Sequence, residues 1–134
     1  MLNNGNKTKP GTTISLVIVF TVCMVLTVIR WLDIFNADIY VINETVNSHI
    51  TNFTLSLLLC TFIGYLLLSA GKKYISNAVI GILLIIANFI YELLLPVLNT
   101  MDVIDALYGL AGVTVSLIYL FVISRYGFVK EQQL

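Results

Sequence analysis

Long apolar runs alternate with short polar segments along the chain. Four of the runs cover positions 13–32, 52–70, 75–95 and 103–124. Each holds about 20 residues, enough for a helix to cross the roughly 30 Å of hydrocarbon in a bilayer. Lipid offers backbone polar groups no partners, so each run must satisfy its own hydrogen bonds as a helix. The pattern predicts an all-α membrane protein, a single domain over residues 1–134 whose four transmembrane helices form an up-down bundle.

A shorter periodicity lies in the outer loop between the first two runs, positions 33–51. Apolar residues recur there at intervals of four, three and four, at Phe35, Ile39, Ile42 and Val46. This spacing is typical of one face of a helix. It predicts a short interfacial helix that lies on the outer leaflet or covers the end of the bundle. A simple tether is the alternative.

The composition also indicates a membrane protein. Of the 134 residues, 59% are hydrophobic and only 10% are charged, which is more apolar surface than a soluble domain of this size can bury. The net charge is zero and the basic residues are scattered, so the lipid bilayer is the expected partner and nucleic acid is not. Cys23 and Cys60 lie inside apolar runs, where cysteine is commonly a small buried residue. No spacing typical of a metal site or phosphate-binding loop occurs, and no cofactor is predicted.

The charges are divided between the two ends of the predicted bundle. One end carries basic residues, namely Lys7, Lys9, Lys72, Lys73, Arg125 and Lys130. The other end has Arg30 as its one base and carries the acidic residues Asp33, Asp38, Glu44, Glu92, Asp102 and Asp105. Basic residues stay on the cytoplasmic side. We therefore expect both termini in the cytoplasm, the acidic end outside and, given the short loops, a bacterial inner membrane. Residues 1–11 are expected to form a disordered tail that stays attached.

Small and polar residues form a stripe along each predicted helix. The stripes are Cys23, Thr27 and Arg30; His49, Ser56, Cys60 and Gly64; Asn77, Gly81, Asn88 and Glu92; and Asp105, Gly109, Gly112 and Ser116. Small residues at such spacing allow helix backbones to approach closely in a membrane, so the stripes predict packing seams through most of the bundle. In the outer third each stripe ends in an ionisable group. Such groups are costly enough in a membrane to be functional candidates.

Arg30 and Glu92 each lie about one turn below the outer end of their predicted helices. Because the two residues share a depth, we expect them to face each other across an outward-opening polar cavity, with Asn88 one turn below Glu92. The alternative is that both side chains extend separately to the lipid headgroups.

Two carboxylates fall at the start of the fourth predicted helix. Asp102 is expected to cap the helix by accepting backbone N–H bonds, whereas Asp105, one turn deeper, is less easily explained as a cap. His49 enters the second helix from the same side, and both a structural role and a ligand-binding role are open for it. One histidine with three acids is too generic a set to predict a metal site.

The stretch from Glu92 to Gly112 resembles the motif of VanZ-like membrane proteins, the family that includes the teicoplanin-resistance factor. Glu92 matches the family's glutamate near the end of a membrane helix, and Asp105 matches its aspartate. Gly112 matches a later glycine, while Asp102 fits the small polar position before the aspartate. The resemblance implies a helical membrane protein of the cell envelope.

The resemblance is partial. His49 and Phe53 are similar to a His-Phe patch at the start of the family's second helix, but the charged residues that precede this patch in the family are missing. The family's arginine, glutamine and asparagine are replaced by Asn99, Leu95 and Gly109. If the chain is VanZ-like, Arg30 is expected to supply in space the positive charge that Asn99 lacks.

Three classes of function follow. The resemblance implies an envelope protein, linked to glycopeptide (teicoplanin) resistance, whose outer pocket binds an anionic or amphiphilic cell-wall or lipid ligand through Glu92, Asp105, Arg30, His49, Asp102, Asn99 and Asn88. One alternative is a non-catalytic subunit or chaperone that docks on other membrane proteins through its small-residue stripes. The other is an oligomeric proton-coupled carrier that uses Glu92. Paired carboxylates can act as acid and base, but no nucleophile has an evident base, so catalytic residues and enzymatic activity are left open.

Overall fold

The computed structural model describes residues 6–35, 39–94 and 102–129. In these residues the chain forms four helices, α1 (Pro10–Ile34), α2 (Glu44–Ser69), α3 (Tyr74–Leu94) and α4 (Val103–Tyr126). Two short strands, β1 (Lys7–Thr8) and β2 (Phe128–Val129), precede α1 and follow α4. All four helices are long and apolar enough to cross a membrane. The prediction of an all-α fold with four long helices is therefore confirmed, and the apolar character of these helices indicates a multi-pass membrane protein.

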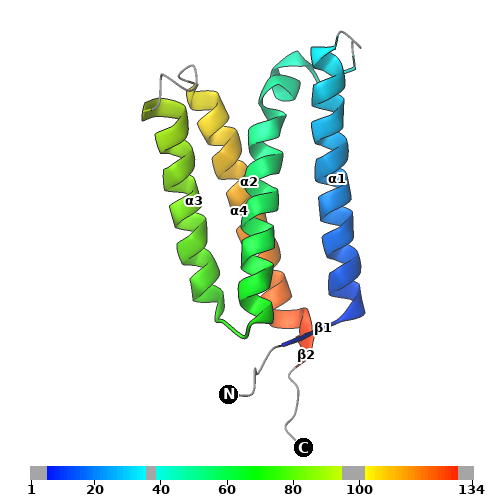
Figure 1. The fold of residues 1–134 in the computed structure, drawn as a ribbon, viewed down its shortest axis with the longest axis vertical. Helices are drawn as coiled ribbons and strands as arrows, with labels where there is room; N and C mark the ends of the chain where they lie inside the picture. The colour runs from blue at the N-terminus through cyan, green and yellow to red at the C-terminus, as the bar shows by residue number, and fades with distance from the viewer. Residues whose placement is uncertain (1–5, 36–38, 95–101, 130–134) are drawn as a thin grey trace, which may run out of the picture.

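Each helix runs antiparallel to the next, as Figure 1 shows. The most extensive packing is between α2 and α4. α3 packs on both of these helices, whereas α1 packs chiefly on α2. α1 and α3 consequently lie on opposite flanks of a bundle whose central pair is α2 and α4 (Figure 1).

The core between the helices contains an apolar cluster, beside buried polar residues such as Thr61, Asn77 and Ser116. The buried residues of the cluster are Cys60, Leu68, Val113, Leu120 and Ile123. Glycines from the predicted stripes line the contacts: Gly64 lies against Leu120, and Gly81 lies against Leu117. With no side chain at these positions, a leucine of the neighbouring helix fills the space that a Cβ atom would need, so the prediction of packing seams is confirmed here.

The start of α2 differs from the prediction. The helix begins at Glu44, eight residues before the predicted start at 52, because the side chain of Asn43 caps it by accepting a hydrogen bond from the Val46 amide at 2.9 Å. Val46 therefore belongs to α2, while Ile39 and Ile42 lie outside any helix. The predicted interfacial helix is wrong, because its apolar stripe joins residues of two different elements.

The predicted disordered tail is also wrong for its described part. β1 pairs antiparallel with β2, and α1 begins directly after it at Pro10, a position that suits proline because the first helical N–H needs no partner. The Lys9 amide donates to the Gly127 carbonyl at 2.9 Å. We call β1, β2 and Gly127 the terminal clip. It holds the start of α1 next to the end of α4.

Candidate functional site

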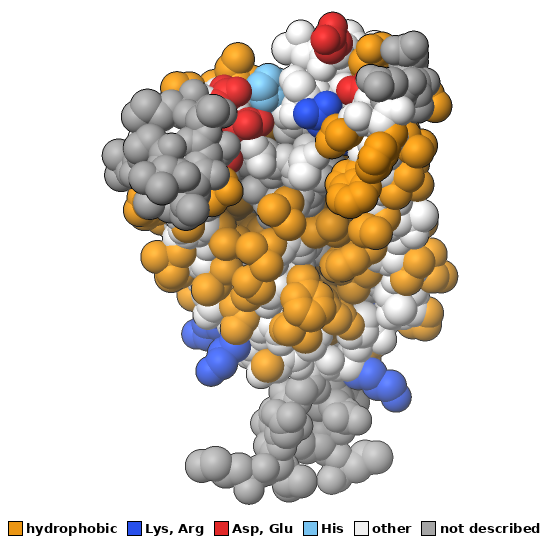
Figure 2. Space-filling model, turned by 45° about the horizontal axis from the view of Figure 1, so that its top comes forward, with side chains coloured by type: hydrophobic (Ala, Val, Ile, Leu, Met, Phe, Trp, Pro, Cys, Tyr) orange, Lys and Arg blue, Asp and Glu red, His pale blue; other side chains and the backbone are white. Residues whose placement is uncertain are grey.

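Charge is separated along the bundle axis. Most basic side chains lie at the end that carries the terminal clip, whereas the acidic side chains and the histidine gather, together with Arg30, at the other end, which we call the acidic end (Figure 2). In the described residues the acidic end contains Asp33, Glu44, Glu92, Asp102 and Asp105. The polar interactions at this end fall into three groups, one for each helix that packs on α2.

The first group joins α2 to the start of α4. His49 Nδ1 lies 2.8 Å from Asp105 Oδ1 and 3.8 Å from Asp102 Oδ2. Asp102 caps α4 as predicted, because its Oδ1 accepts from the Ile104 amide at 2.8 Å and the Asp105 amide at 3.4 Å. The His49 ring also packs on Tyr108, with the ring centroids 5.4 Å apart. His49 and Asp105, predicted separately, thus form one hydrogen-bonded pair.

The second group joins α3 to α2 and α4. Glu92 is buried, with 2% of its surface exposed, and its Oε1 accepts a hydrogen bond from Asn52 Nδ2 at 3.4 Å. Asn88 donates to the Ala106 carbonyl at 3.1 Å. The Asn88 amide occupies the space that a side chain at Gly109 would need. Glu92 and Asn88 therefore point into the bundle.

The third group joins α1 to α2. Arg30 Nη1 lies 3.2 Å from Asp33 Oδ2, and the same oxygen accepts from Asn47 Nδ2 at 2.8 Å. The predicted pairing of Arg30 with Glu92 is wrong, because α1 and α3 lie on opposite flanks of the bundle. Arg30 likewise does not supply the positive charge expected beside Glu92 and Asp105. Asn99, the remaining predicted site residue, lies outside the described residues.

Sequence reasoning overlooked two asparagines that organise these groups, Asn47 and Asn52. Asn47 is fully buried, and Asn52 binds Glu92. Hydropathy placed Asn47 in a loop and Asn52 at the edge of a span. The cap at Asn43 is the signal that could have found Asn47, because a helix that starts at 44 includes this residue. Asn52 already lies in the predicted span, and its spacing on the helix does not reveal its contact with Glu92.

A groove of about 260 Å³ runs along the contact between α2 and α3 below Glu92. It is lined by Asn52, Leu55, Ser56, Leu59, Leu84, Ala87, Asn88, Tyr91 and Glu92. Leu55, Leu59 and Tyr91 are exposed large apolar residues, so the groove opens sideways to the surroundings of the bundle. It combines an apolar opening with several polar groups, as ligand sites usually do.

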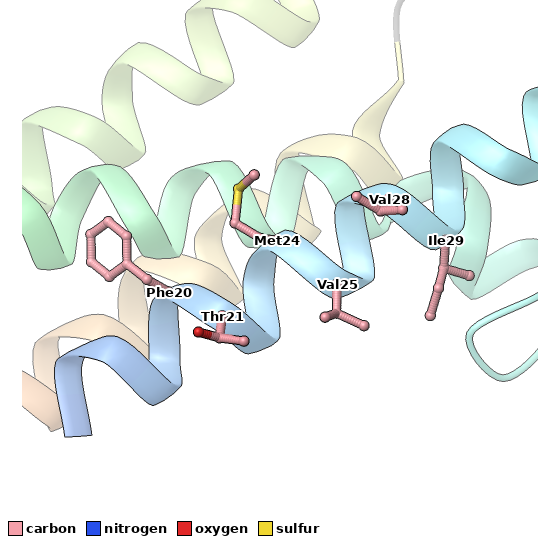
Figure 3. Close-up of a pocket in the computed structure, with 6 residues that line it drawn as sticks. All are labelled: Phe20, Thr21, Met24, Val25, Val28 and Ile29. Atoms are coloured by element: carbon pink, nitrogen blue, oxygen red, sulfur yellow. The ribbon is translucent and has the colours of Figure 1, made fainter. Parts of the chain in front are cut away.

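Two other hollows lack this combination. One, of about 400 Å³, lies on α1, and Figure 3 shows that all six of its residues come from this single helix. Thr21 is the one polar residue among them. Another lies between α2 and α4 beside Tyr108. Both suit contact with acyl chains. No family model, no curated protein and no solved structure matches the chain.

Proposed function

We propose that the protein is a bacterial envelope membrane protein that binds a lipid-like amphiphile in the groove between α2 and α3. The observation that carries the proposal is the polarity gradient of the groove. Its upper end is formed by Asn52, Asn88 and Glu92, and its lower end by Leu59 and Leu84. Glu92 and Leu84 are eight residues apart on one helix, or about 12 Å, so a polar head and the first part of an acyl chain fit along one line.

The polar groups at the upper end favour a particular kind of head. The carboxyl oxygens of Glu92 can accept hydrogen bonds, so Glu92 suits a ligand that carries hydroxyl or ammonium donors. The amides of Asn52 and Asn88 can add acceptors as well as donors. Arg30, the base at this end, is paired with Asp33 on the opposite flank. An amphiphile with a hydroxyl or ammonium head therefore fits better than a purely anionic one.

The resemblance to VanZ-like proteins agrees with an envelope role. Glu92 and Asp105, which carry most of that resemblance, both lie at the acidic end and point toward other helices. On this proposal, deleting the gene changes the susceptibility of the cell to lipid-bearing glycopeptides. A non-catalytic subunit would instead copurify with a stoichiometric partner in mild detergent.

The proposal includes an orientation, with the acidic end outside and both termini in the cytoplasm. It is supported by the basic residues at the clip end, since basic residues stay cytoplasmic. Cysteines introduced at Ile42, which is 81% exposed, and at the exposed Lys73 test it in intact cells. We expect an impermeant maleimide to label position 42 and to reach position 73 only after permeabilisation. The native Cys23 and Cys60 are 3% and 1% exposed and should contribute little background.

Lipid photocrosslinking tests the groove directly. The full chain is reconstituted into vesicles that contain phosphatidylethanolamine or phosphatidylglycerol with a diazirine in one acyl chain. We expect crosslinks on peptides 55–59 and 84–91, more with the ethanolamine head. Hydrogen bonds to charged groups contribute about 1.5–3 kcal/mol, so Glu92→Gln should weaken labelling by the ethanolamine probe roughly tenfold or more.

Two tryptophan variants control for the groove itself. Leu59→Trp places a large ring in the groove and should block crosslinking. Leu66→Trp alters an exposed leucine on the same helix, outside the groove, and should leave crosslinking unchanged. Labelling that spreads evenly over all four helices, or that ignores both Glu92→Gln and Leu59→Trp, would show that the groove is ordinary lipid contact surface.

A further inference from the structure

Three potential metal ligands meet where α2 lies against the start of α4. The donor atoms of His49, Asp102 and Asp105 all lie within 4.8 Å of one another. Histidine nitrogen and carboxylate oxygen are both zinc ligands. From this cluster we infer that the three side chains form a site for one divalent cation of the zinc class, which joins α2 to α4 at the outer rim of the bundle.

The distances between the donor atoms suit one shared ion. Zinc binds nitrogen and oxygen at about 2.0–2.2 Å, so two donors on a tetrahedral zinc ion lie about 3.4 Å apart. His49 Nδ1 is 2.8 Å from Asp105 Oδ1 and 3.8 Å from Asp102 Oδ2. These values lie on either side of the ideal separation. Small side-chain rotations therefore bring the three donors around one centre.

The backbone holds one ligand in place. Asp102 uses Oδ1 to accept the Ile104 and Asp105 amides, and this cap directs its other oxygen toward His49. Tyr108 packs against the His49 ring and limits its rotation. Groups that orient a ligand in this way are typical of metal sites. The cluster thus has neighbouring groups that hold Asp102 and His49 in position, as well as the donor atoms themselves.

Charge and access favour an ion of this class. Two carboxylates and a neutral imidazole together carry two negative charges, which one divalent cation balances. Calcium and magnesium prefer all-oxygen sites, whereas imidazole favours zinc and related ions. The side chains of His49, Asp102 and Asp105 are 13%, 32% and 23% exposed. An ion can therefore enter from the outer face and keep a water molecule as its fourth ligand.

Calorimetry on the full chain in detergent micelles, after treatment with EDTA, tests the site with zinc chloride as the probe. We expect one zinc ion per chain and a zinc-dependent rise in melting temperature, because a ligand that binds the folded state stabilises it. Asp102→Asn is the informative variant: asparagine also caps helices well, so α4 keeps its cap while the ligand loses its charge. In metal sites, substitution of a residue that only orients a ligand lowers metal affinity about 10–100-fold. Asp102→Asn and His49→Gln change the ligands themselves, so each should lower the zinc affinity by at least this factor.

Glu44→Gln serves as the matched control. Glu44 is an exposed acid in the first turn of α2 at the same end of the molecule, outside the cluster, so its loss should leave zinc affinity unchanged. Three results would each overturn the inference: no stoichiometric zinc binding by the wild type, unchanged affinity in a folded Asp102→Asn protein, or calcium binding as tight as zinc binding. Circular dichroism of each variant separates lost binding from lost folding.

Discussion

Single residues determine how closely the helices approach. On α4, Gly112 lies directly against the backbone of α2 at Phe53 and Leu57, whereas Gly109 makes room for the amide of Asn88. The difference matters because a side chain such as Asn88 can rotate away from an added methyl group, but a packed backbone cannot. Gly112 is therefore the less replaceable of the two glycines.

Gly112→Ala should destabilise the protein. The added Cβ would overlap the Phe53 carbonyl oxygen and lie 3.1 Å from the Leu57 nitrogen, and overpacking of this kind costs about 1–3 kcal/mol. Thermal unfolding in detergent measures the loss. Gly11→Ala is the control, since a Cβ there meets nothing within 4 Å. It should leave the melting temperature unchanged or raise it slightly, because alanine is the better helix former. Equal melting temperatures for wild type and Gly112→Ala would contradict this reading of the contact.

At this scale the sequence predicted which residues face inward better than it predicted their partners. Spacing alone identified Glu92 and Gly112 as inward-facing, since a stripe needs only helical periodicity. The partner of Arg30 could not be found in this way. The predicted helix ended at 32, but α1 continues to Ile34 and brings Asp33 onto the face of Arg30. Arg30 and Glu92 share a depth in the bundle, but a shared depth does not say which helices are neighbours.

At the scale of elements, hydrophobicity located the four helices but not the start of α2. Residues 44–51 include Glu44, Asn47, Ser48 and His49 and are too polar to register as part of an apolar run. They are helical because Asn43 caps them and because Glu44 suits the positive end of the helix dipole. This extension is what brings His49 and Asn47 to their partners, so the candidate sites depend on a helix cap.

Asn43→Ala should loosen the beginning of α2. Loss of an asparagine cap costs about 1 kcal/mol, and the Val46 amide, which donates to Asn43 at 2.9 Å, would lose its acceptor. Hydrogen exchange should show faster exchange at Val46, with little change near the middle of the helix. Asn43→Asp keeps a capping oxygen and should exchange like the wild type. Unchanged protection of Val46 in Asn43→Ala would mean that packing alone holds this turn.

At the scale of the whole molecule, α1 packs the least extensively on the other helices. Its outward residues are widely exposed, among them Val17 at 60%, Met24 at 56% and Trp31 at 61%. It is joined to the rest of the bundle at intervals along its length. These contacts are the terminal clip, the Ser15 to Tyr119 hydrogen bond at 2.7 Å, the Thr27 to Thr54 bond at 3.1 Å and the bridge from Asp33 to Asn47. The distribution of charge predicted which charged residues lie together at each end of the bundle. It could not predict the terminal clip, because strands of two residues are too short for an alternation of apolar and polar residues to be recognised.

Gly127→Val should open the terminal clip. A Cβ at this position would lie 2.8 Å from both Thr12 Oγ1 and the Ile123 carbonyl oxygen, so the chain must move away from α1. The expected result is faster hydrogen exchange at the Lys9 amide, which donates to Gly127, together with a lower melting temperature. Tyr126→Ala, at a residue that is 73% exposed, is the neighbouring control and should change neither. A wild-type exchange rate at Lys9 in Gly127→Val would show that the clip tolerates a side chain there.

The terminal clip also constrains the order of biogenesis. β1 is translated before α1, whereas its partner β2 leaves the ribosome only after α4. Until then the first helix has α2 as its main neighbour. Closure of the clip is thus a late step in assembly, and a ribosome stalled before residue 128 would leave α1 held only by its contacts along α2 and α4.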